Sequence, residues 1–253
     1  MRMHAILTAV FLLLMAMPPA FAETPDAAAI VKAGFDHYRG RASEAEVEMV
    51  IHRPSWERTM RMKAWTKGTD KSLIRITAPP KDEGNGTLKK GHEMWTYNPK
   101  VNRVIKLPPA MMAQSWMGSD FSNNDLAKSD SILNDYTHTL TGTETHEGHT
   151  VYVIESMPRP AAPVVWGKQV LKIRDDDILL SETFFDEELA PVKRMTARDI
   201  QMMGGRLFPK IWRMQEVDKE DEYTLLRYHA LSFPDDLPER IFTLNALKTF
   251  QGR

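Results

Sequence analysis

The sequence contains no cysteine, and this absence excludes several kinds of chemistry at once. Without a thiol the chain has no disulfide bond and no cysteine nucleophile. It also lacks the cysteine on which a bacterial lipoprotein carries its lipid anchor. Its stability must therefore come from a packed core, even in an oxidising compartment.

An excess of positive charge is also missing. The 33 basic residues balance 34 acidic ones, which leaves a formal net charge of −1. Proteins that bind nucleic acid usually show a basic excess or a basic stripe, so the composition predicts no nucleic-acid partner. Linkers, repeats and low-complexity segments are absent too. We therefore predict a single domain over residues 23–253, which is within the usual range for an all-β chain.

Long apolar runs are absent beyond the N-terminus. The run AILTAVFLLLMAM follows the basic start Met1-Arg2-Met3-His4 and is short for a membrane span. A small-residue box, Ala20-Phe21-Ala22, comes next. We predict that residues 1–22 are a secretory signal peptide, cut before Glu23, and that the mature protein is periplasmic. An uncleaved membrane anchor is the alternative.

The period of the apolar residues changes once along the mature chain. Residues 26–39 carry Ile30, Val31, Phe35 and Tyr38 near helical spacing, which predicts an amphipathic helix. From residue 44 onward apolar and polar residues alternate, which is typical of antiparallel strands with one drier face. The alternating segments are 44–52, 56–66, 71–78, 92–99, 101–108, 139–145, 149–156, 168–175, 178–186, 192–200, 206–217 and 223–231, with a further short strand around Leu88 and a short helix within 237–248.

So many strands in one sheet should make it curl. Sheets of roughly ten or more strands rarely stay open and flat. The pattern therefore predicts a mainly β (α+β) fold, with one long curled antiparallel sheet and helices against one face. The helix over 26–39 and the segment 108–127 are the expected covers of the concave face.

The segment 108–127 is unusual for a loop because it is rich in large apolar residues. Met111, Met112, Trp116, Met117 and Phe121 stand among prolines, glycine, serines, aspartates and asparagines. They could cover a cavity as a lid, or they could fill an ordinary core. Burial in a core is the commoner fate of such residues, although methionine also suits surfaces that accept irregular apolar ligands.

Catalytic and metal-binding motifs are not found. His146 and His149 miss the zinc-protease spacing and straddle a glycine turn, so we predict a hairpin there. Four aspartates recur at intervals of five residues but lack the glycine and glutamate of a calcium loop. There is no G-x-S-x-G elbow and no phosphate loop. The four aspartates are Asp120, Asp125, Asp130 and Asp135. We predict no enzyme activity, no metal and no cofactor.

Basic residues gather just before the apolar segment. Lys89, Lys90, Arg103 and Lys106 could ring the mouth of a cavity and attract anionic head groups. An ordinary solvated strand face is the other interpretation, and we favour it.

Several short motifs in the middle of the chain occur in an order that resembles a known family. They are Trp65-Thr66-Lys67-Gly68, Ser72-Leu73-Ile74-Arg75, the turn from Ala78 to Gly86, Trp95-Thr96-Tyr97-Asn98-Pro99, Arg103-Val104-Ile105 and Met117-Gly118-Ser119-Asp120-Phe121. In this order they resemble the outer-membrane lipoprotein-sorting protein family, which is related to the LolA/LolB-type periplasmic lipoprotein carriers. The resemblance covers about residues 26–130 and continues more loosely beyond.

The resemblance implies an incomplete antiparallel β-barrel with helices covering its concave face. It also implies a periplasmic carrier that binds lipid or lipoprotein acyl chains in an apolar cavity for transport to the outer membrane, with transient membrane contact. A resistance-nodulation-type inner-membrane transporter is an implied partner. For segment 108–127, it makes the lid the favoured interpretation.

Two other functions stay open at this point. The chain could be an accessory subunit that docks on an inner-membrane lipid exporter without carrying cargo. A hydrolase would need a triad or carboxylate cluster, and none stands at a recognisable spacing. For the carrier, strand alternation and the apolar segment predict the lipid-binding residues Met60, Met62, Trp95, Met112, Trp116, Met117, Phe121, Phe184 and Trp212.

Overall fold

A computed structural model describes residues 25–249, so the predicted signal peptide lies outside the described residues. The described chain forms one antiparallel sheet of 13 strands, which confirms the predicted mainly β fold. The strands are β1 (Ala42–Arg53), β2 (Trp56–Lys67), β3 (Lys71–Ala78), β4 (Gly86–Lys90), β5 (Glu93–Asn98), β6 (Arg103–Lys106), β7 (Tyr136–His146), β8 (His149–Pro158), β9 (Lys168–Arg174), β10 (Leu179–Phe185), β11 (Pro191–Met203), β12 (Arg206–Glu216) and β13 (Tyr223–Ser232).

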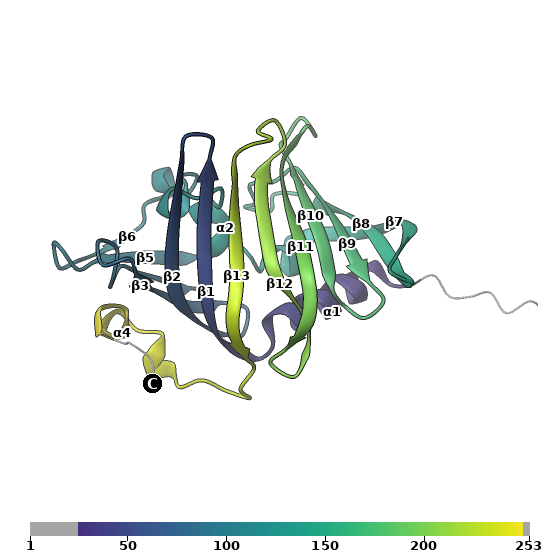
Figure 1. The fold of residues 1–253 in the computed structure, drawn as a ribbon. Coiled ribbons are helices and arrows are strands. Elements are labelled where there is room, and N and C mark those ends of the chain that lie inside the picture. Colours follow the sequence, from purple (N-terminus) through teal and green to yellow (C-terminus); the bar gives the residue numbers. More distant parts are fainter. Residues whose placement is uncertain (1–24, 250–253) are drawn as a thin grey trace, which may run out of the picture.

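The strand order is set by one long-range pairing. Strands β1 to β6 form one meander and β7 to β13 form another, and β1 pairs with β13 to join them. The register runs from Glu44 opposite Ser232 to His52 opposite Tyr223. As a result β6 and β7, which follow each other in sequence, lie at opposite edges of the open sheet (Figure 1).

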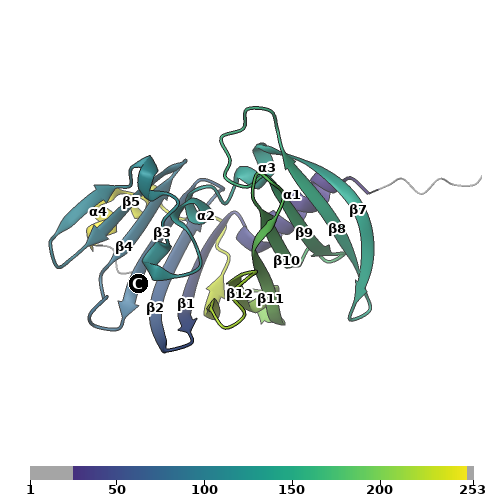
Figure 2. The same ribbon diagram turned by 90° about the horizontal axis from the view of Figure 1, so that it is seen from above.

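Irregularities in the ladders help to bend the sheet. The register shifts at Glu46/Val47 between β1 and β13, and at Arg61/Met62 between β2 and β3. Such bulges bend a strand and increase its local twist. Figure 2 shows the result, a trough whose two walls are the two meanders.

The link from β6 to β7 has to run from one edge of the sheet to the other, and it does so through the trough. We call residues 107–135 the crossing segment. Figure 2 shows α2 and α3 between the two walls of the trough. The segment contains the 3₁₀ turns η1 (Pro109–Met111) and η2 (Trp116–Gly118) and the short helices α2 (Asn123–Ala127) and α3 (Ser131–Asn134).

Helix α1 (Ala27–Arg39) covers the concave face of the second meander, as the sequence predicts. Asp26 caps its start, because Oδ1 accepts a hydrogen bond of 2.9 Å from the Ala28 amide. Gly40 ends it with φ 65°, a conformation that favours glycine. Val31 on its buried face packs against a cluster that includes Ile173 of β9.

The C-terminal residues cover the opposite face of the first meander. Trp65, Leu73 and Leu88 point away from the trough and pack against Phe242 and Leu247. The 3₁₀ turn η3 (Glu239–Ile241) and the helix α4 (Leu244–Thr249) belong to this cover, so the short helix predicted within 237–248 is confirmed. The middle of this meander is therefore buried on both faces, as in β4 from Gly86 to Lys89.

A close backbone approach at Gly167 gives a prediction for stability. A Cβ on Gly167 would lie 2.2 Å from the carbonyl oxygen of Asp186, so Gly167→Ala must displace one of the two chains. We expect it to lower the free energy of unfolding by about 1–3 kcal/mol, as overpacking does. Gly142→Ala is the matched control, because its Cβ would meet no atom within 4 Å. Urea denaturation would measure both, and equal midpoints would contradict the prediction.

Candidate functional site

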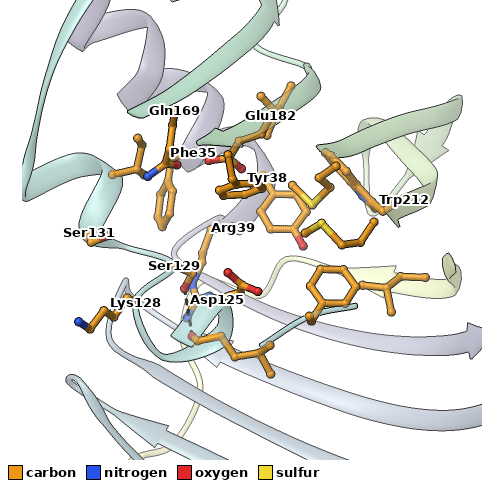
Figure 3. A pocket seen from close by; sticks show the side chains of 18 of the residues that line it. Phe35, Tyr38, Arg39, Asp125, Lys128, Ser129, Ser131, Gln169, Glu182 and Trp212 are labelled. Carbon is orange, nitrogen blue, oxygen red and sulfur yellow. Dashed lines mark hydrogen bonds between the residues drawn. The ribbon is translucent and has the colours of Figure 1, made fainter. Parts of the chain in front are cut away.

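A cavity of about 310 Å³ lies in the trough, between the two walls of the sheet, α1 and the crossing segment (Figure 3). Ligand pockets range from about 300 to 1,000 Å³, so this one is small. Its lining is mostly apolar and includes Val31, Phe35, Met62, Ile74, Trp116, Phe121, Leu126, Leu171, Phe184, Met195, Trp212, Met214 and Leu226.

Five of the predicted lipid-binding residues line this cavity. Met62 comes from β2, Phe184 from β10 and Trp212 from β12, while Trp116 and Phe121 come from the crossing segment. The cavity therefore gathers residues from both meanders and from the segment between them. That they bind lipid stays a prediction.

The other four predicted residues lie outside the lining. Trp95 pairs with Leu88, so it shares that residue's face and points away from the trough. Met60 faces the trough but is fully buried in a cluster with Trp116. Met112 and Met117 belong to the crossing segment, and neither reaches the cavity. Alternation alone could not tell which face of β5 is the concave one.

The apolar face of the crossing segment is held to the first meander by Trp116. The Trp116 ring is buried against Met60, Met62 and Ile76, and its Nε1 donates to Thr87 Oγ1 over 3.0 Å. Phe121, five residues on, packs with Phe184 of the second meander. The two aromatic rings thus connect the two walls of the trough, as expected for a cover.

A polar contact pins the same segment to the sheet. Asp120 accepts hydrogen bonds from Arg53 at 2.9 Å and from Thr224 Oγ1 at 2.5 Å. The Asp120 amide donates to Thr224 Oγ1 over 3.0 Å. Arg53 and Thr224 stand near the paired ends of β1 and β13, so this contact lies where the two meanders join.

Two buried ion pairs attach the helices of the crossing segment. Lys193 of β11 donates to Asp125 of α2, and Lys89 of β4 donates to Asp130 over 2.5 Å. All four side chains are more than nine-tenths buried. Burial lowers the pKa of Lys89, although its hydrogen bond to Asp130 opposes the shift. Lys89 is therefore a buried anchor and takes no part in a basic ring at the cavity mouth.

Among the described residues, Glu182 of β10 is the one carboxyl on the sheet that lines the cavity. It is half-buried, and the structure assigns it no hydrogen bond or ion pair within residues 25–249. Burial, with a smaller contribution from the negative charge of Asp125 and against the opposing charge of Lys193, raises the pKa of Glu182 to about 7. The cavity thus holds a carboxyl that titrates near neutral pH.

Glu182 and Lys193 are not among the site residues predicted from the sequence, because each stands in an ordinary alternating strand. Glu182 is in phase with Phe184, and Lys193 is in phase with Met195. A charged residue in phase with the apolar face of a strand is the signal that could have found them. Asp125, in contrast, stands at the start of a short helix, where it forms a capping box with Ser122.

The histidine pair forms the predicted hairpin turn. Glu147 and Gly148 have φ of 50° and 81° between β7 and β8. His149, Asp175 and Asp176 offer three atoms within 4.8 Å that could hold a metal ion. However, Asp176 already accepts two hydrogen bonds from Arg174, and Asp175 pairs with His149 at 2.7 Å. Both carboxylates of this cluster are therefore already engaged by neighbouring side chains.

The raised pKa of Glu182 predicts how stability depends on pH. Below about pH 4.5 Glu182 is protonated in both the folded and the unfolded chain. As pH rises toward about 7, the unfolded chain loses this proton first, so the folded state loses stability. Glu182→Gln should therefore be more stable than the wild type at pH 8, by up to about 3 kcal/mol, and equal to it near pH 4.5.

Urea denaturation at several pH values would measure this difference. Glu188→Gln, in the exposed turn after β10, is the matched control and should follow the wild type throughout. A Glu182→Gln curve parallel to that of the wild type would contradict the raised pKa.

No helix among residues 25–249 is long and apolar enough to cross a membrane. A search of curated proteins finds no significant match to the chain. Solved structures do match. A DUF1329 family protein from Desulfovibrio piger aligns with a TM-score of 0.77 and 24% identity, over 88% of this chain and 100% of that one.

Two further structures match over a similar share of the chain. A LolA superfamily protein from Nitrosomonas europaea matches with a TM-score of 0.73 and 22% identity, over 88% of this chain and all of that chain. A domain from Vibrio parahaemolyticus, described as a putative outer membrane lipoprotein-sorting protein domain, matches with a TM-score of 0.75 and 22% identity, over 88% of this chain and 98% of that chain. At these identities the matches confirm the fold that the sequence motifs imply.

The family itself is shown by a sequence model. Residues 68–249, well over half of the chain, match the model of a family described as uncharacterized protein-like. The chain therefore belongs to this family, and it shares the open, helix-covered sheet of the LolA-type and lipoprotein-sorting structures.

Proposed function

We propose that this protein is a periplasmic carrier that binds acyl chains of lipids or lipoproteins and takes them toward the outer membrane. The observation that carries the proposal is the apolar cavity of about 310 Å³ enclosed by the sheet, α1 and the crossing segment. Residues 23–253 act together as one lipid-binding domain. The fold shared with a lipoprotein-sorting domain supports this function.

The size and lining of the cavity suit a flexible chain. Each CH₂ group removed from water contributes about 0.8 kcal/mol, so even part of one acyl chain would bind measurably. Met62, Met195 and Met214 add side chains that adapt to irregular apolar shapes. A cavity this small favours one chain over several. Modest affinity is useful to a carrier because the cargo must leave again.

The proposal also covers where the protein works, its lack of catalysis and its partner. The predicted signal peptide would place the protein in the periplasm, between the two membranes that it touches transiently. The carrier needs no catalytic group, which agrees with the lack of nucleophile motifs in the sequence. A resistance-nodulation-type inner-membrane transporter is the proposed donor of cargo. The rival is an accessory subunit of such an exporter that carries nothing.

Mass spectrometry of the gently purified protein tests the carrier directly. After organic extraction we expect a stoichiometric apolar species. Ala64→Phe, which fills the cavity, should abolish it, whereas Ala230→Phe on an exposed part of β13 should not. If the wild type is empty and also binds neither added fatty acid nor added fatty alcohol, the carrier is excluded and the cargo-free subunit becomes the better account.

Opening of the crossing segment can be tested because the chain has no cysteine of its own. Asp120 and Thr224 lie in direct contact, so Asp120→Cys with Thr224→Cys should form a disulfide that locks the segment to β13. Oxidised protein should exchange a bound fatty alcohol at least about tenfold more slowly, since ligand release would need the segment to move. Reduction should restore the rate. Equal exchange in both states would show that the cargo leaves by another route.

A further inference from the structure

We propose that Glu182 anchors the head of the cargo, and that the cargo is an amphiphile whose head donates hydrogen bonds, through an amine or a hydroxyl group. The inference rests on the proposed carrier function and names the class of ligand that it selects. It starts from Glu182, the one charged lining residue within 25–249 to which the structure assigns no hydrogen bond or ion pair.

The charged groups around the cavity differ in what they contact. Arg39 donates to the carbonyl oxygens of Gly68 at 2.8 Å and Lys71 at 2.9 Å, and Lys128 donates to a backbone carbonyl. Asp125 is paired with Lys193. Figure 3 shows Arg39, Asp125, Lys128 and Glu182 around the same space. Every charged lining group except Glu182 is therefore already engaged.

The neighbours of Glu182 on the sheet are apolar. Its cross-strand neighbours are Leu171 on β9 and Met195 on β11, and Phe184 follows on the same face. A carboxyl group in such surroundings is costly unless it receives a hydrogen bond. A ligand that fills the cavity would remove the remaining water from Glu182. Its head must then supply the missing donor, or the carboxyl stays unpaired.

A head with the opposite chemistry fits poorly. A carboxylate or phosphate would add negative charge close to Glu182 and Asp125, while the nearby cations Arg39, Lys128 and Lys193 are already occupied. Like charges in a buried site repel strongly. An amine would form a charge-assisted hydrogen bond with Glu182, and a hydroxyl would form a neutral one.

The titratable groups that face Glu182 decide how this selection depends on pH. Asp125 of α2 and Lys193 of β11 act on it directly. Burial raises the pKa of Tyr136 to about 12 and that of Tyr228 well above its usual value, so both phenols stay neutral. Glu182, with a pKa of about 7, is thus the group that changes charge between about pH 5.5 and pH 8.

Calorimetric titration with three ligands of one chain length tests the anchor. We would use decylamine, decanol and decanoate with the wild type, Glu182→Gln and the exposed control Glu188→Gln. At about pH 8 the wild type should bind decylamine roughly tenfold tighter than decanoate, the size of one charge-assisted hydrogen bond. This preference should fade at about pH 5.5, where Glu182 is protonated.

The variants separate the anchor from other effects. Glu182→Gln should show no preference for the amine at either pH value, while its binding of decanol differs from that of the wild type by less than about threefold, because an amide still accepts a hydrogen bond. Glu188→Gln should behave as the wild type. Ala64→Phe, whose cavity is filled, reports any binding of decylamine to the protein surface.

The outcomes tell the two proposals apart. If the wild type binds all three ligands equally, or if Glu182→Gln keeps the preference, the anchor is overturned and the carrier stands. If the wild type binds none of them, the carrier itself falls. The pH dependence of the wild type decides the matter even if a variant folds poorly.

Discussion

The pairing of β1 with β13 is the constraint on which the rest of the structure depends. Because it joins the two meanders at the middle of the sheet, it places β6 and β7 at the two free edges. These strands are consecutive in the chain, so the crossing segment must travel the full width of the sheet. The shortest course lies through the trough. The topology therefore supplies a cover for the concave face, and the apolar residues of that cover follow from where it has to lie.

The cover is attached in two chemically different ways. Trp116 and Phe121 bury apolar rings against opposite walls of the trough, and such contacts do not depend on direction. The ion pairs of Asp125 with Lys193 and of Asp130 with Lys89 add direction, since a buried charge is costly unless its partner stands in place. Hydrophobic residues in place of both ion pairs could hold the segment as firmly. The charged pairs instead define one docked position and leave the cavity beside it.

Much of this arrangement can be predicted from the sequence, and the misses have a physical pattern. The change of period from helix to strand and the apolar character of the segment that holds Trp116 and Phe121 depend on the local order of residues, so both can be seen in the sequence. The concave face of β5 is set by its pairing with β4 and by the residues near the C-terminus that cover the other face. Strand alternation contains neither piece of information, so it assigns Trp95 to the wrong face of the sheet. The sequence does not single out Glu182, because strand alternation identifies an apolar face and gives no special weight to one charged residue within it.

The same carboxyl links stability to selection. With its pKa raised to about 7, Glu182 makes the empty protein less stable at neutral pH than an uncharged residue would. A core built only for stability would hold an apolar side chain at this position between Leu171 and Met195. A ligand that donates a hydrogen bond removes this cost when it enters, because the loaded protein then has the hydrogen bond to Glu182 that the empty protein lacks. The discrimination between heads would then come from the difference between a satisfied and an unsatisfied carboxyl, which the apolar tail alone cannot provide.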